Sequence, residues 1–230
     1  MTNKLRELFE THGMMSVRKQ RSFANFLGQH AFEYHKSEGT LSLPAQGQTS
    51  SEPRVYKVQV LGSEDSKTWL WAWANEQSEF PESQLQAAQR LKILGEEHGI
   101  EEFTAPRLPL ERVSGHFLAS VALGVLDMPA YYRGAVGQTS LVCLLEGVPP
   151  LAPMGGAELV ATLGDAISNF EFRNHRKSVE AFLGQLGLAA SWETNAFQVT
   201  TEDGVLVIGQ FDDKNRLAKL STRLPAQASG

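Results

Sequence analysis

Three of the four tryptophans in this chain stand at alternate positions of one short segment, residues 68–75. Side chains at alternate positions of a β-strand point to the same face of the sheet. A strand here therefore places Trp69, Trp71 and Trp73 together as an aromatic strip. On one interpretation the strip is a binding site that stacks on a base, a sugar or an extended peptide. On the other it is core, because indoles of this size dominate core burial.

The opposite face of the same strand is expected to carry Leu70, Ala72 and Ala74. The two alanines leave room for a helix to approach the sheet closely. Residues 113–126 are the candidate helix, because apolar side chains surround that segment on several sides. The sequence thus predicts a buried helix against the face without tryptophans.

A second candidate site is acidic. Glu96, Glu97, Glu101 and Glu102 gather around the end of a helix predicted over residues 81–98. Carboxylates at a helix C-terminus oppose the helix dipole and repel one another, so the helix itself does not explain them. On one interpretation they form a solvated surface, and on the other they bind a basic protein partner.

The sequence contains no motif that we assign to catalysis, a metal or a cofactor. His30 and His35 fall on opposite faces of a predicted strand, and no spacing of histidine, cysteine and carboxylate fits zinc. Residues 212–215 begin like a calcium loop but lack its glycine and its final glutamate. Residues 134–137 lack the third glycine of a dinucleotide site. We therefore expect no catalytic residue, no metal ligand and no cofactor.

The charge distribution argues against nucleic acid as a partner. The net charge is −5, and residues 62–111 hold 10 acidic but only 4 basic side chains, whereas surfaces that bind nucleic acid are basic. No apolar run reaches the roughly 18 residues that suggest a membrane span, and the start of the chain does not read as a secretion signal. The single cysteine, Cys143, can form no disulfide within the chain. These features predict a cytoplasmic protein with no membrane partner.

Periodicity predicts an α+β fold whose first domain, residues 1–147, packs helices on an antiparallel sheet. Two helices are expected in the first 28 residues, separated at Gly13, because glycine commonly ends a helix. Residues 45–53, rich in Gln, Ser and Gly, are expected to form a loop. The other expected helices span residues 81–98 and 113–126, and the expected strands span residues 31–35, 40–43, 55–61, 67–74, 131–133 and 139–146.

A Pro- and Gly-rich linker, residues 148–156, is expected to separate this domain from a smaller one. The smaller domain, residues 157–224, reads as two helices followed by a four-stranded meander. It could serve as a recognition module of its own.

The tryptophan segment and its surroundings resemble a known family. The run Thr-Trp-Leu-Trp-Ala-Trp-Ala-Asn at residues 68–75 is similar to the marker strand of an uncharacterised bacterial domain family of unknown function. Residues 32–35, 58–63 and 131–134 resemble other recurring pieces of that family, and the likeness extends over residues 14–147. The resemblance implies the limits of the first domain, and it implies no activity, because the family has none to carry over.

Two classes of function fit these features. The first is a non-enzymatic protein-binding protein of the cytoplasm, specifically an immunity protein that neutralises a basic bacterial toxin domain through the acidic surface. The second is a small-ligand-binding domain, or an enzyme, that uses the tryptophan strip or residues 131–133 beside an aromatic-lined pocket. Solvent-facing indoles would favour the second class, and buried indoles would leave them only a packing role.

Overall fold

The computed structural model describes residues 1–45 and 53–224. Its contacts divide the chain into two compact units. The first unit consists of Met1–Phe9 and Lys19–Pro150, and the second consists of Glu10–Arg18 and the described residues from Leu151 onward. The second unit thus includes a stretch of chain near the N-terminus that the sequence assigns to the first domain.

One helix, α1 (Asn3–Leu27), replaces the two that the sequence predicts. Gly13 lies inside this helix, although glycine costs a helix about 1 kcal/mol relative to alanine. Burial outweighs this cost, because Gly13 and its neighbours Met14 and Ser16 are all buried. The helix ends instead at Gly28, whose φ of 62° suits glycine. The predicted break at Gly13 is therefore wrong.

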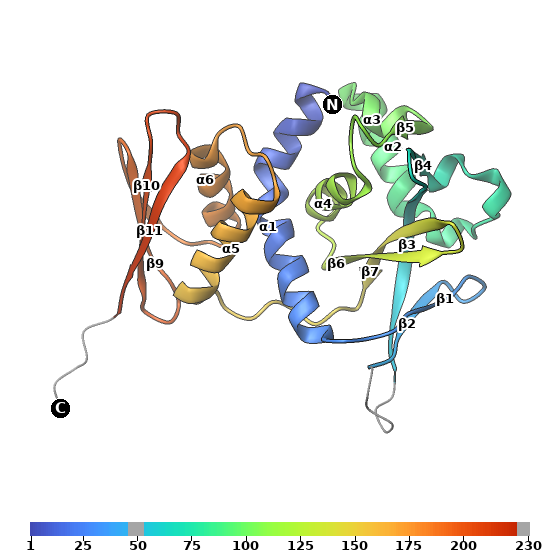
Figure 1. Ribbon diagram of the computed structural model, residues 1–230, viewed down its shortest axis with the longest axis horizontal. Helices are drawn as coiled ribbons and strands as arrows, with labels where there is room; N and C mark the ends of the chain where they lie inside the picture. The colour runs from blue at the N-terminus through green and yellow to red at the C-terminus, as the bar shows by residue number, and fades with distance from the viewer. Residues whose placement is uncertain (46–52, 225–230) are drawn as a thin grey trace. The chain divides into compact units, whose positions relative to one another are not determined.

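The first unit is built on a seven-stranded antiparallel sheet (Figure 1). The strands are β1 (Glu33–His35), β2 (Thr40–Leu43), β3 (Arg54–Glu64), β4 (Thr68–Trp71), β5 (Arg107–Pro109), β6 (Ala130–Val136) and β7 (Thr139–Glu146). The long strand β3 is central: β7 pairs with one of its edges, while β2 and β4 pair with the two ends of its other edge. The predicted α+β class with an antiparallel sheet is confirmed, and β5 is an additional strand that the sequence did not reveal.

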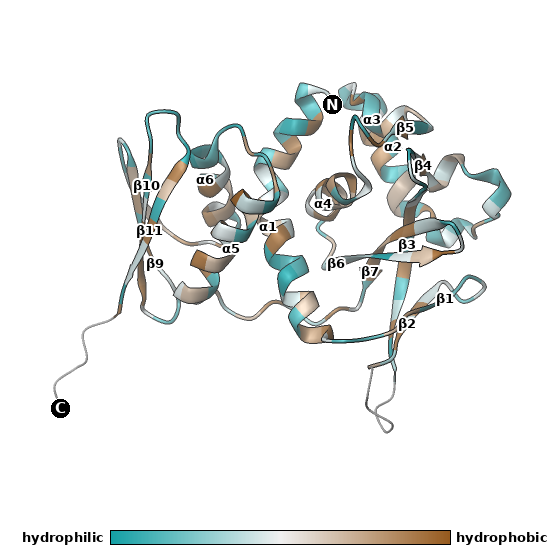
Figure 2. Cartoon of the chain, in the orientation of Figure 1, coloured by the Kyte–Doolittle hydropathy of each residue, from teal (hydrophilic) through white to brown (hydrophobic). Residues whose placement is uncertain are grey.

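Helices and short 3₁₀ turns complete the first unit. They are η1 (Ala72–Ala74), η2 (Glu76–Ser78), η3 (Glu82–Gln84), α2 (Gln86–His98), α3 (Glu101–Thr104) and α4 (Gly115–Val125). As predicted, α4 is a largely buried, hydrophobic helix (Figure 2). A Cβ added at Gly115, in its first turn, would lie 3.0 Å from the ring of Trp69. The start of α4 therefore lies on the tryptophan face of the sheet, and its predicted position on the opposite face is wrong.

The tryptophan segment is a strand only in its first half. Strand β4 ends at Trp71, and Ala72–Ala74 forms η1. The pairing explains this early end. Strand β5 pairs with β4 only as far as Leu70, and the register of β3 with β7 shifts between Val60 and Gly62, the residue that pairs with Trp71. Trp69 and Trp71 share one strand face, but the predicted strip of three indoles is wrong for Trp73.

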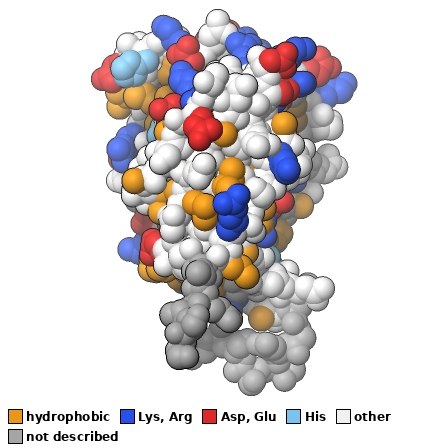
Figure 3. Space-filling view, turned by 90° about the vertical axis from the view of Figure 1, so that its left-hand side faces the viewer, with side chains coloured by type: hydrophobic (Ala, Val, Ile, Leu, Met, Phe, Trp, Pro, Cys, Tyr) orange, Lys and Arg blue, Asp and Glu red, His pale blue; other side chains and the backbone are white. Residues whose placement is uncertain are grey.

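The second unit combines two helices with a four-stranded sheet. The elements are α5 (Gly156–Asn169), α6 (His175–Gln185), β8 (Ala190–Glu193), β9 (Ala196–Thr200), β10 (Leu206–Phe211) and β11 (Leu217–Arg223), with the strand order β11-β10-β9-β8. The predicted helix-helix-meander is confirmed. The buried carboxylate of Glu10, on α1, accepts hydrogen bonds from the N–H of Arg173 (2.7 Å) and the hydroxyl of Ser178 (2.8 Å). In the view onto the sheet side of this unit, acidic and basic side chains are interspersed (Figure 3).

Within residues 1–45 and 53–224, no helix combines the length and the hydropathy needed to cross a bilayer. The same part of the chain has no cluster of three or more His, Cys, Asp or Glu side chains that could hold a metal ion. Most of the loop expected at residues 45–53 lies outside the described residues.

Candidate functional site

The two strand tryptophans are core residues. Trp69 and Trp71 are both 0% exposed, and their ring centroids lie 5.3 Å apart in an edge-to-face pair. The indole N–H of Trp71 donates to the carbonyl of Glu102 at 2.9 Å. The indole of Trp69 lies so close to Gly62 and Gly115 that a Cβ at either position would crowd the ring. Neither tryptophan is available to a ligand at the surface.

Trp73 is half-buried and belongs to η1. The ammonium of Lys92 lies 4.6 Å from the centroid of its ring, which is a cation–π contact. This contact occupies one face of the ring. Trp73 therefore has a partner within the first unit already.

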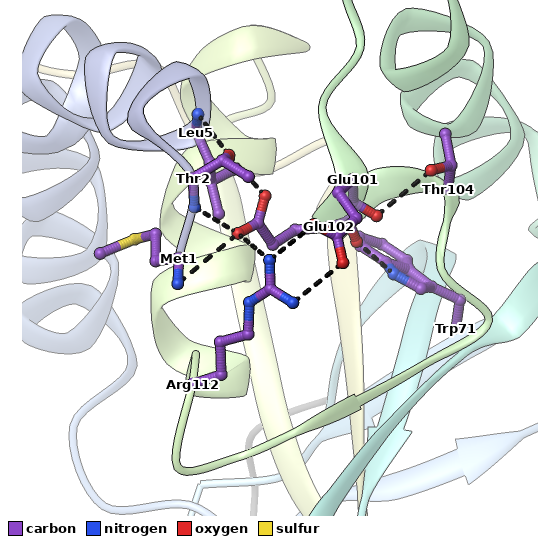
Figure 4. A network of polar contacts seen from close by, with 8 residues as sticks. All are labelled: Met1, Thr2, Leu5, Trp71, Glu101, Glu102, Thr104 and Arg112. Atoms are coloured by element: carbon purple, nitrogen blue, oxygen red, sulfur yellow. Dashed lines mark hydrogen bonds and ion pairs between the residues drawn. The ribbon is translucent and has the colours of Figure 1, made fainter.

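Glu102 is the buried member of the predicted acidic cluster, with a side chain that is 0% exposed. Its carboxylate accepts hydrogen bonds from the backbone N–H of Thr2 (2.5 Å) and from the hydroxyl of Thr2 (2.6 Å). The guanidinium of Arg112 lies 3.4 Å from the same carboxylate (Figure 4). Glu102, which lies in α3, thus holds Thr2, the residue that caps α1. Its role is structural.

The other three glutamates of the cluster are exposed. Glu101 forms two hydrogen bonds with Arg112, at 2.9 and 2.8 Å, and these bonds and the positive charge lower the pKa of Glu101 from its usual value. Glu96 lies 4.0 Å from the ammonium of Lys92. Glu97 has no ion pair among the described residues. The acidic surface is therefore smaller and more neutralised than the sequence suggests.

Residues 131–133, the other aromatic candidate, also make contacts within the fold. Tyr131 is buried, and its hydroxyl lies 3.2 Å from Nδ1 of His116. Nε of Arg133 donates to the carboxylate of Glu64, which is buried. This polar cluster joins β3, β6 and α4, and no sequence pattern indicates this role of Glu64.

The face of the sheet opposite Trp69 and Trp71 carries a groove with a volume of about 550 Å³. Its floor is a row of cross-strand neighbours on β7, β3, β4 and β5, namely Leu141, Ser63, Leu70 and Arg107. Its walls and rim are Tyr34, Lys36, Asp65, Thr68, Asn75, Gln77, Ser78, Phe80, Val136 and Thr139. We call this site the sheet groove.

A buried glutamine fixes one wall of the sheet groove. Gln84, which is 3% exposed, accepts a hydrogen bond from the hydroxyl of Tyr34 (2.6 Å) and donates one to the carbonyl of Lys36 (2.7 Å). Burial, with a smaller effect of the nearby Cys143 thiol, raises the pKa of Tyr34 to about 12. The phenol therefore stays protonated at neutral pH and is a fixed wall instead of a general base.

Hydrogen bonds from side chains to the backbone fix two further parts of the groove. Asp65 accepts the backbone N–H groups of Lys67 (2.7 Å) and Thr68 (2.6 Å), and these bonds lower the pKa of Asp65 from its usual value. Asn75 accepts the N–H of Ser78 at 3.2 Å and so begins η2. The sheet groove is thus preformed by the fold.

A smaller apolar surface, which we call the α2 surface, lies between α2 and the end of α4. Arg90, Ile93, Leu94 and Glu97 follow helical spacing and, with Val125 and Leu126, line a cavity of about 220 Å³. Ile93 is 52% exposed. Ile93, Leu94, Val125 and Leu126 together form an apolar patch with Arg90 and Glu97 beside it, and apolar patches rimmed by polar residues are found at protein interfaces.

None of the sheet-groove residues is among the binding candidates that the sequence indicates. Strand alternation places Leu70 on the correct face, the one without tryptophans, but it predicts a helix packed against that face. The signal in the sequence is the alternation that puts Leu70 on this face. Ser63 falls between the expected strands, residues 55–61 and 67–74, where alternation assigns no face. The pairing of Ser63 with Leu70 and Leu141 supplies what this signal lacks.

The fold and the site together define an antiparallel α+β domain with a groove on one sheet face. The chain belongs to the family of unknown function DUF6882, whose sequence profile matches residues 6–148. The resemblance to an uncharacterised domain family is thereby confirmed, and all residues of the sheet groove fall within the matched range. Comparisons with curated proteins and with solved structures find no match.

Proposed function

We propose that the first unit is a small-ligand-binding domain and that the sheet groove is its ligand site. The observation that carries this proposal is a preformed groove of about 550 Å³ with a floor that is partly apolar and a rim that is polar. Ligand pockets typically measure about 300–1,000 Å³ and combine apolar walls with a few fixed polar groups. Leu70, Phe80 and Leu141 supply the apolar part, on which a flat ligand can lie.

Filling the groove is expected to block binding while leaving the fold intact. Ser63 stands in the floor row and is half-buried, and phenylalanine is well suited to a strand. We expect Ser63→Phe to weaken the binding of phenylnaphthylamine, a neutral fluorescent probe, by about tenfold or more, because the new ring occupies its space. A fluorescence titration measures this change.

The matched control is Ser221→Phe, which adds the same ring to an exposed position of β11 in the second unit. It should bind the probe as the native protein does. Circular dichroism of both variants verifies that they remain folded. Unchanged probe binding by a folded Ser63→Phe variant would rule out the sheet groove as the site.

We also propose a protein-binding role for the α2 surface. Exposed Ile93 and the neighbouring carboxylates of Glu96 and Glu97 favour a partner that offers an apolar side chain and basic residues. The more specific proposal is an immunity protein of the bacterial cytoplasm that neutralises a basic toxin domain. The single buried Cys143 is consistent with a reducing compartment.

Substituting the exposed isoleucine tests this second role. After co-expression with the product of the neighbouring gene, Ile93→Asp should weaken the complex by about tenfold or more, since the substitution places a charge at the centre of the contact. Val55→Asp is the control, because Val55 is similarly exposed, at 55%, elsewhere in the first unit. Equal retention of the partner by both variants would exclude the α2 surface.

A further inference from the structure

We propose that the ligand of the sheet groove is a small organic anion, with a flat apolar body and one anionic group. The inference rests on the proposed function of the groove as a ligand site. It adds the chemical class of the ligand, and the charges around the groove carry it.

Two cationic side chains line the groove with their donor groups unused. Lys36 and Arg107 are both exposed, and among the described residues neither the ammonium nor the guanidinium takes part in an ion pair or a hydrogen bond. By contrast, Lys92, Arg112 and Arg133 of the same unit each pair with a glutamate. The lowered pKa of Asp65 comes mainly from its two backbone hydrogen bonds, with a smaller effect of the Arg107 charge. The donor groups of Lys36 and Arg107 thus remain available to an incoming anion.

The two cations are held at defined places. Arg107 is the cross-strand neighbour of Leu70, so its stem begins in the floor row beside the apolar part of the groove. The carbonyl of Lys36 is hydrogen-bonded to buried Gln84, which fixes the backbone from which the lysine side chain extends. A ligand that lies on Leu70 can thus direct its anionic group toward one or both cations.

Asp65 is the only acidic residue among those that line the groove. One oxygen of its carboxylate accepts the backbone N–H groups of Lys67 and Thr68, so the turn after β3 already uses it. The lining therefore has one more positive than negative side chain. This excess stands out because residues 62–111, which supply much of the lining, hold 10 acidic and 4 basic side chains.

Neutral donors extend the anion-binding character of the groove. The side-chain oxygen of Asn75 accepts the N–H of Ser78, while its amide NH₂ has no acceptor among the described residues. The hydroxyl groups of Ser63 and Thr68 also line the groove. Positive charge beside neutral donors and an apolar floor favours an amphipathic anion over a purely apolar ligand or a cation.

A pair of probes separates the charge from the apolar body. Anilinonaphthalene sulfonate and phenylnaphthylamine share their aromatic rings, and only the first carries a negative charge. We expect the native protein to bind the sulfonate more tightly. Replacing both cations, in a Lys36→Gln/Arg107→Gln variant, should weaken the sulfonate by about tenfold or more and leave the neutral probe unchanged, because only charge-assisted contacts are lost.

The control is Lys57→Gln/Arg223→Gln, which removes two exposed positive charges that do not line the groove. It should bind both probes as the native protein does. Binding of both probes that Ser63→Phe blocks supports the proposed function. If the Lys36→Gln/Arg107→Gln variant then keeps its affinity for the sulfonate, the inference about the anion fails while the proposed function stands. If neither probe binds in a saturable way, both fail.

Discussion

Replacing Glu102 by alanine is expected to lower the free energy of unfolding of the first unit by about 3 kcal/mol. The substitution removes the acceptor for the N–H and the hydroxyl of Thr2 and leaves a cavity at a position that is 0% exposed. Arg112 is not left unpaired, because it keeps its two hydrogen bonds to Glu101. The expected loss of unfolding free energy is therefore at the lower end of the range for breaking a buried ion pair. Urea unfolding, followed by tryptophan fluorescence in a Trp192→Phe background, reports on the first unit alone.

The neighbouring glutamates provide the matched series for this experiment. Glu101→Ala should cost less than Glu102→Ala, because the pair of Glu101 with Arg112 is exposed and screened by solvent. Glu97→Ala should change stability least, since Glu97 is exposed and has no ion pair among the described residues. Similar losses at all three positions would contradict the structural role of Glu102.

Elements with strong local signals could be predicted from the sequence. The apolar run at residues 113–126 contains α4, and the hairpins and the meander of the second unit follow from alternation between turn residues. Gly13 shows the limit of such signals. Glycine favours a helix end locally, but the buried residues around it make α1 continuous, and this burial depends on contacts distant in the sequence.

The candidate site was less predictable than the fold. The floor of the sheet groove joins Ser63, Leu70, Arg107 and Leu141, which lie on four strands and become neighbours only through the pairing register. The acidic cluster shows the opposite case. Glu101 and Glu102 are adjacent in the sequence, yet one is exposed and the other is fully buried. Residue type and spacing reveal neither the register nor the burial.

Trp69 and Trp73 belong to one motif, but removing them is expected to have very different effects. Trp69→Ala should lower the free energy of unfolding of the first unit by about 3–5 kcal/mol, as is typical when a buried large aromatic is truncated. The ring of Trp69 is fully buried against Gly62 and Gly115, so its removal leaves a large cavity between the sheet and the start of α4. Trp73→Ala should cost about 1 kcal/mol, because it removes a half-buried ring and one cation–π contact.

The two substitutions distinguish a strand that stops at Trp71 from one that runs through the whole motif. If all three indoles lay on one face of a single strand, Trp69 and Trp73 would occupy equivalent environments, and their removal would cost similar amounts. The early end of β4 makes them unequal: Trp69 fills the space between the sheet and α4, whereas Trp73 follows the strand in a 3₁₀ turn. Urea unfolding of Trp69→Ala and Trp73→Ala, each in the Trp192→Phe background, measures the difference, and equal losses would contradict this account of the motif.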